Sequence, residues 1–158
     1  MVDAQKEYQG QTHDGDTVKQ YAAKIVSDPG KHNGLYWKVA AGEPQSPIGP
    51  LVAEAAAAGY TRKQGGGGPT PFHGYIYRHL NSQGPAAPGG AKDYMVDGKM
   101  TGGFALLAYP AEYRNSGVMT FMVNQDGIVY QKDLGPDTAK IAASMTQYNP
   151  DSSWQKAE

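Results

Sequence analysis

The sequence predicts an α+β fold with segregated elements, in which amino-terminal helices pack on a four-to-five-stranded antiparallel meander and a last helix closes the chain. Apolar residues recur at helical spacing before residue 60 and alternate with polar residues after residue 72. Between these parts, four consecutive glycines favour an irregular chain. We expect a single domain over 1–158, with a helical part (1–61), a glycine-rich linker (62–71) and a sheet part (72–158).

Four helices are expected. The first covers residues 2–9. Asp16 is predicted to cap the second, whose apolar residues follow helical spacing: Val18, Tyr21, Ala22 and Ile25. The third begins at Pro50 and ends at Gly59, the residue types preferred at these two positions. The fourth begins at Pro136 and presents one face made of Thr138, Ile141, Ala142 and Met145.

Alternating residues predict the strands of the meander. Their expected ranges are 75–80, 93–96, 104–109, 118–124 and 128–132. In the first strand, Tyr75, Tyr77 and His79 share one face. In the fourth, the residues expected to point toward the core are Met119, Phe121 and Val123.

Composition and charge exclude several classes of function. With 14 Lys and Arg against 15 Asp and Glu, and no basic run longer than Arg62-Lys63, we expect no nucleic-acid partner. No apolar run approaches the roughly 18 residues of a membrane span, so we expect no membrane insertion. Without cysteine there is no disulfide, thiolate nucleophile or cysteine-bound metal. No cofactor is expected.

Few side chains suggest catalysis. His73 and His79 flank the first strand, and Asp93 and Glu112 are carboxylates that the fold could bring to them. A base and a carboxylate within about 3 Å across a cleft would favour a hydrolase acting on an extracellular or cell-wall polymer. Because their spacing does not support such a pair, we expect no catalytic residues and treat the hydrolase as an alternative.

The segment Asp14-Gly15-Asp16 is similar to a fragment of a calcium-binding loop. It departs from that pattern because the first ligand position would be Thr12 and the last would be Ala23. A turn followed by a helix cap explains the segment more simply. A calcium-stabilised structural domain that uses Asp14 and Asp16 is therefore a second alternative.

Tyrosine is the main compositional bias, with eleven Tyr against three Phe. Tyrosine has an apolar body and a polar tip, which suits both contact surfaces and half-buried sheet packing. Both interpretations stay open here. The tyrosines expected to contact a ligand lie near the strands: Tyr75, Tyr77, Tyr94, Tyr109 and Tyr113.

Long motifs resemble a bacterial family catalogued as domain of unknown function number 2950. They include DPGKHNGLYW, AAGEPQSPIGPLVAEA, a run from residue 68 (GPTPFHGYIYRHLNSQGPAAPGGAKDYMVDGKMTGGFALLAYPAEY) and SGVMTFMVNQDGIVYQKDLGPDTAKIA. The resemblance covers nearly the whole chain. It implies an exported protein with its signal peptide removed, and hence a periplasmic or extracellular location. It implies no activity.

A weaker resemblance is to the globular heads of type IV pilin-like proteins. It rests on AQKEYQGQ, which is similar to an amphipathic helix, and on the strand pattern GFALLAYPAEYRNSGVMTFMVNQDGIVY. The chain lacks the amino-terminal apolar helix that anchors pilins. Together these observations favour a non-catalytic cell-envelope binding or scaffolding module, whose partner is an envelope protein or a glycan.

Overall fold

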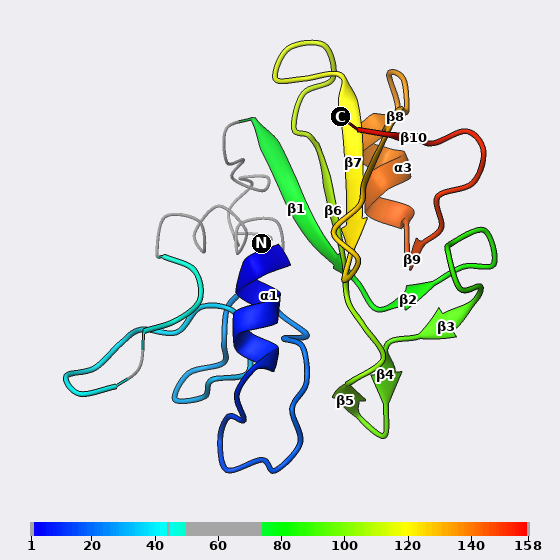
Figure 1. Ribbon diagram of the computed structural model, residues 1–158. Coiled ribbons are helices and arrows are strands. Elements are labelled where there is room, and N and C mark those ends of the chain that lie inside the picture. Colours follow the sequence, from blue (N-terminus) through cyan, green and yellow to red (C-terminus); the bar gives the residue numbers. More distant parts are fainter. Residues whose placement is uncertain (1, 44, 50–73, 158) are drawn as a thin grey trace.

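A five-stranded antiparallel sheet dominates the computed structural model, which describes residues 2–43, 45–49 and 74–157 (Figure 1). The strand order is β1-β6-β7-β8-β10, and every neighbouring pair is antiparallel. The strands are β1 (Tyr75–Leu80), β6 (Ala105–Pro110), β7 (Met119–Asn124), β8 (Val129–Asp133) and β10 (Gln155–Lys156). The predicted antiparallel sheet and the broad α+β class are confirmed.

The meander is interrupted by short strands between β1 and β6. One small sheet has the order β3-β2-β9 and contains a parallel pair; its strands are β2 (Ser82–Gln83), β3 (Lys92–Asp93) and β9 (Gln147–Tyr148). A hairpin joins β4 (Met95–Val96) to β5 (Lys99–Met100). Its turn residues Asp97 and Gly98 have φ of 51° and 75°, the positive values that a tight two-residue hairpin turn requires.

Of the two amino-terminal helices predicted within the described residues, the first is present as α1 (Val2–Gln9). The helix predicted to follow Asp16 is wrong, because residues 11–25 form an irregular loop. Ala22 and Ile25 are buried as expected, but the carbonyl of Ile25 accepts a hydrogen bond from the distant Tyr36 amide. The amide of Tyr21 likewise donates to the carbonyl of Met100, so these backbone groups are not available to a helix. The predicted helix at 50–59 and the linker at 62–71 lie outside the described residues.

The last predicted helix exists as α3 (Thr138–Ser144), but it does not close the chain. Thr138 and Ala142 are buried, whereas Ile141 is exposed. After α3 the chain continues through β9 to β10, which adds to the edge of the main sheet beside β8. Trp154, just before β10, is buried against the main core.

The core lies on the face of the main sheet that α3 covers. Arg78 on this face donates to backbone carbonyls of α3, which places the helix over it. The buried residues of β7 are consequently Thr120, Met122 and Asn124. The prediction that Met119, Phe121 and Val123 face the core is wrong, since these residues are only half-buried on the opposite face. Other members of this core are Ile76, Leu80, Tyr94, Phe104, Leu107, Tyr148 and Trp154.

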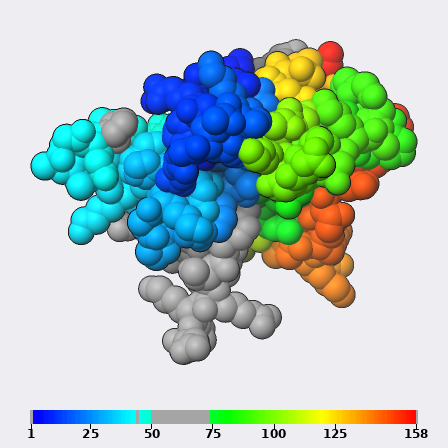
Figure 2. Space-filling model, turned by 90° about the horizontal axis from the view of Figure 1, so that it is seen from below, coloured from blue at the N-terminus to red at the C-terminus, as the bar shows by residue number. Residues whose placement is uncertain are grey.

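A second apolar cluster lies beside the sheet and holds α1 in place. It combines Ala4 and Tyr8 of α1 with Ile25, Leu35 and Trp37 from the following loops. In Figure 2 this amino-terminal segment lies against the part of the chain that holds the β4–β5 hairpin, in agreement with the hydrogen bond from Tyr21 to Met100. None of the helices in the described ranges has the length and apolar character needed to cross a membrane.

Candidate functional site

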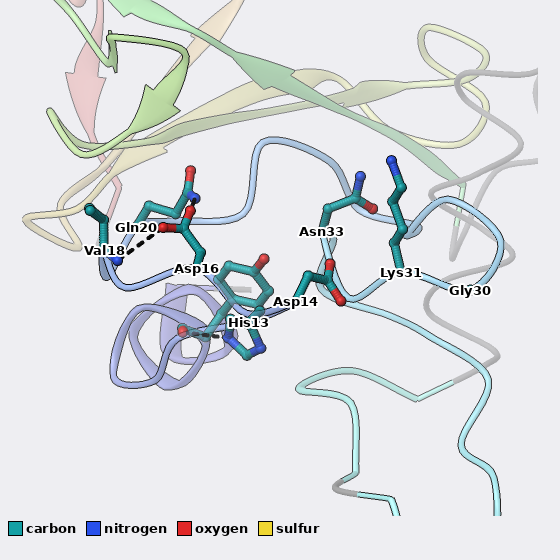
Figure 3. Close-up of a pocket in the computed structure, with 9 residues that line it drawn as sticks. His13, Asp14, Asp16, Val18, Gln20, Gly30, Lys31 and Asn33 are labelled. Atoms are coloured by element: carbon teal, nitrogen blue, oxygen red, sulfur yellow. Dashed lines mark hydrogen bonds between the residues drawn. The ribbon is translucent and has the colours of Figure 1, made fainter.

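A polar pocket of about 560 Å³, here called the Asp14 pocket, opens beside the end of α1 (Figure 3). Its walls come from α1, from the loop 13–20 and from residues 30–33. Among the residues that line it are Tyr8, His13, Asp14, Asp16, Gln20 and Lys31. Its volume is in the range of small-molecule sites in proteins.

One wall of the pocket is an aromatic stack. The rings of Tyr8 and His13 lie 3.9 Å apart at 17°. His13 Nε2 lies 2.9 Å from the carbonyl oxygen of Tyr8, so this nitrogen carries a proton and donates. The Tyr8 hydroxyl donates to the carbonyl of His32 at 2.6 Å. Burial raises the pKa of Tyr8 to about 12, and the charges of Asp14 and Asp16 add to this, so the hydroxyl stays neutral.

Both carboxylates in the pocket are held by hydrogen bonds. Asp14 adopts φ of 54°, and its two oxygens lie 2.8 and 3.0 Å from the backbone N–H of His32. Asp16 accepts from Lys99 at 2.7 Å and from Gln20 at 3.1 Å. The hydrogen bond from Lys99 is the main cause that lowers the pKa of Asp16. Asp16 is therefore ionised and locally neutralised.

Lys31 is the second cation near the pocket. Its ammonium makes no hydrogen bond or ion pair with any residue of the described ranges, where the ion pairs are Lys24–Asp28 and Lys99–Asp16. In those ranges no group of three or more His, Cys, Asp or Glu side chains is arranged to hold a metal ion. The ammonium of Lys99 contacts one carboxylate oxygen of Asp16, and Gln20 donates to the other.

The pocket continues around the stack into a second hollow of about 320 Å³, which shares Tyr8, His13 and Asp14. There the ring of His32 stacks on Trp37 at 4.4 Å. Sequence reasoning identified Asp14 and Asp16 but missed His13, Lys31, His32 and Trp37. The signal that could have found them is the density of aromatic and imidazole side chains between residues 8 and 37.

The family of the protein follows from a match over almost the entire chain. A family model described as "Protein of unknown function (DUF2950)" matches residues 1–157. The chain belongs to the DUF2950 family. No curated protein and no solved structure matches it. The DUF2950 match includes the Asp14 pocket, but the function must be argued from the side chains themselves.

The tyrosines predicted to contact a ligand fall into two groups in this DUF2950 chain. Tyr94 is fully buried and donates to Gln83 Oε1 at 2.9 Å, and Tyr109 is also buried, so both are core residues. Tyr75, Tyr77 and Tyr113 are half-buried. Tyr75 packs near Phe121, and Tyr113 donates to Asp133 at 2.7 Å. Of the five tyrosines predicted to contact a ligand, these three are therefore the ones with exposed surface.

The residues named for the hydrolase alternative are spread along strand β1. His73 lies outside the described residues. The ring nitrogens of His79 are shielded from solvent, and burial lowers its pKa to about 4. Asp93 pairs in register with Ser82, beyond the end of β1, whereas Glu112 follows Pro110, the partner of Tyr75 at the start of β1. The two carboxylates are thus near opposite ends of the strand.

Proposed function

We propose that this DUF2950 chain is a non-catalytic binding module of the cell envelope, and that it holds a polar ligand in the Asp14 pocket. The observation that carries the proposal is that Asp14, His13 and Lys31 line one pocket of ligand size. Polar groups that converge on a concave site are typical of ligand recognition.

The bonds that fix these side chains favour binding over catalysis. A recognition site gains affinity when its groups are held in place before the ligand arrives. Asp14 is held by the His32 amide, and Asp16 is held by Lys99. A general base works best with a pKa near the working pH, whereas Lys99 lowers the pKa of Asp16.

The proposed location is periplasmic or extracellular, and the proposed partner is an envelope glycan or an envelope protein. The resemblance to an exported family supports the location. Fractionation of cells that express the complete gene product checks this part directly. Recovery of the protein in the cytoplasmic fraction would overturn it.

A thermal-shift screen tests the binding function. The purified chain is melted with amino acids, short peptides, cell-wall fragments, glycans, calcium and chelator. A ligand that binds only the folded state at a hundred times its Kd stabilises it by about 2.7 kcal/mol, which such a screen detects. We expect one ligand class to raise the melting temperature. A flat response to the whole panel contradicts the proposal, and release of cleaved products from a polymer contradicts its non-catalytic character.

Two variants locate the binding surface. Asp14→Asn keeps a side-chain oxygen for the His32 amide but removes the charge from the pocket. Tyr113→Phe changes the half-buried tyrosine surface by removing the hydroxyl that donates to Asp133. If the ligand shift is lost in Asp14→Asn and kept in Tyr113→Phe, the ligand binds in the pocket. The reverse pattern would show that the ligand binds at the half-buried tyrosines instead.

A further inference from the structure

We infer that the Asp14 pocket takes a zwitterionic ligand, namely a free amino acid or a short peptide with free termini. In this assignment the ligand ammonium binds the carboxylate of Asp14, and the ligand carboxylate binds the ammonium of Lys31. The inference rests on the binding function proposed above and gives its ligand a chemical class.

Two unlike charges, those of Asp14 and Lys31, lie apart from one another in the same pocket. Asp14 and Lys31 both line it, yet they form no ion pair with one another. In Figure 3 the carboxylate of Asp14 lies between His13 and the segment that carries Lys31 and Asn33. Each charge is therefore free to meet an opposite charge on a ligand, which gives specificity through electrostatic complementarity.

The residues that line the Asp14 pocket present one net charge of each sign to a ligand. The negative charge of Asp16 is paired with Lys99 at 2.7 Å, so it adds little to the field inside the pocket. Among the other lining residues, one negative charge remains at Asp14 and one positive charge at Lys31, which also acts on Asp28 outside this pocket. A ligand that is only anionic is repelled by Asp14, and one that is only cationic is repelled by Lys31. A ligand that carries one charge of each sign satisfies both.

Asp14 and His13 offer hydrogen-bond acceptors to a ligand ammonium. An ammonium has three protons to donate. The oxygens of Asp14 receive one backbone N–H, from His32, out of about four lone-pair positions on an ionised carboxylate. Because His13 Nε2 is protonated, its Nδ1 is an acceptor in the neutral ring, and it has no hydrogen bond to the described residues. Asp14 and His13 together can accept all three protons.

A matched set of probes separates the two charges. Isothermal titration is carried out with L-alanyl-L-alanine, its N-acetyl derivative, its carboxy-terminal amide and a neutral disaccharide. We expect saturable binding of the dipeptide. Binding of each blocked derivative should be about tenfold weaker, as for the loss of one charge-assisted contact.

Two variants then assign each charge to its residue. Asp14→Asn should weaken binding of the dipeptide and the amide, but should not weaken binding of the N-acetyl derivative, which has already lost its ammonium and is freed from the repulsion by Asp14. Lys31→Gln should weaken the dipeptide and the N-acetyl derivative, but not the amide. The Lys31 side chain forms no ion pair with the described residues that Gln would break, so this variant should fold normally. Matched controls, Asp137→Asn at the N-cap of α3 and Lys140→Gln within α3, remove the same charges outside the pocket and should bind as the unaltered chain does.

The outcomes separate the inference from the proposed function. Equal affinity for the dipeptide and both blocked forms, or an effect of neither variant, overturns the zwitterionic assignment. Binding of the disaccharide that is lost in Asp14→Asn, without binding of the dipeptide, also overturns it but leaves the binding function intact. If no compound of the wider panel binds saturably, the binding function itself is overturned.

Discussion

The ammonium of Lys99, in the β4–β5 hairpin, lies 2.7 Å from the carboxylate of Asp16, 83 residues earlier in the chain. This contact joins the loop that builds the Asp14 pocket to the sheet part of the protein. The amide of Met100 reinforces it by donating to Gln20 Oε1, while Gln20 donates to Asp16. The shape of the pocket thus depends on a hairpin that contributes none of its lining residues named above.

Replacing Lys99 with Met should lower the melting temperature in a pH-dependent way. The bond to Lys99 lowers the pKa of Asp16 in the folded chain, so its stabilising effect is present above the unfolded pKa of about 3.9. The effect is lost as the pH falls through the lower folded pKa. The melting temperatures of both proteins should therefore differ at pH 7 and converge once the pH is below the folded pKa of Asp16.

The control for this prediction is Lys24→Met. Lys24 pairs with Asp28 only four residues away, and both side chains are largely exposed, so this pair joins no distant segments. We expect a smaller change than for Lys99→Met. An equal change in both variants would mean that the Lys99–Asp16 contact has no special role in holding the pocket.

His79 should make stability fall in weakly acidic solution. Burial lowers its pKa to about 4, below the ordinary value of about 6.5, so protonation favours the unfolded chain. The free energy of unfolding should drop by up to about 1.4 kcal/mol per pH unit between these values, or about 2 kcal/mol from pH 7 to pH 5. Denaturant unfolding at both pH values measures the drop, and His79→Gln should remove it. The same drop in the variant would assign it to other groups.

Gly117 is required by the close approach of Tyr75. A Cβ at position 117 would lie 2.4 Å from the Tyr75 hydroxyl oxygen and 2.8 Å from Cζ of its ring. We expect Gly117→Ala to destabilise the chain by about 1–3 kcal/mol, the usual cost of overpacking. In the Tyr75→Ala background this cost should fall, since the clashing ring is gone. Gly49→Ala is the matched control, because a Cβ at Gly49 meets no atom within 4 Å. An equal cost of Gly117→Ala in both backgrounds would exclude the clash as its cause.

The strands could be predicted from sequence because their patterns are local. Residues 75–80, 105–110 and 119–124 are short runs rich in apolar and aromatic side chains, each with a glycine shortly before it, and Asp97-Gly98 is a turn sequence. The orientation of β7 could not be predicted in the same way. Its sequence MTFMVN carries apolar side chains at both parities, so the choice of face depends on where α3 packs. That contact joins residues 67 positions apart.

The same limit explains the missed helix and the missed part of the pocket. Ala22 and Ile25 are buried at helical spacing, but their loop is held by Leu35, Tyr36 and Met100, which are distant in sequence. Asp14 and Asp16 could be recognised as candidate ligands because they lie only two positions apart in the sequence. Lys31 and His32 reach them only through the return of the loop, as the bond from the His32 amide to Asp14 illustrates.

Arg78 is expected to be the main attachment of α3 to the sheet. Its guanidinium donates to the carbonyl oxygens of Ala142 and Met145, the latter at 3.1 Å, at the end of the helix, where the Ala142 carbonyl also accepts from the Met145 amide. A hydrogen bond to a charged group contributes about 1.5–3 kcal/mol, so Arg78→Met should lower the free energy of unfolding by about that amount. Lys140→Gln, a change at an exposed position of α3, is the control.

Hydrogen exchange distinguishes local from global loss in Arg78→Met. If the guanidinium holds α3, the amides of Ile141 and Met145, which donate within and at the end of the helix, should exchange faster than in the unaltered chain. The exchange rates of amides in the centre of β6 and β7 should rise only as much as the loss of global stability requires. Because both bonds come from the single nitrogen Nη1, a lysine ammonium that reaches the same two carbonyls should recover part of the protection. Unchanged exchange in α3 would show that apolar packing of Ala142 alone suffices to hold the helix.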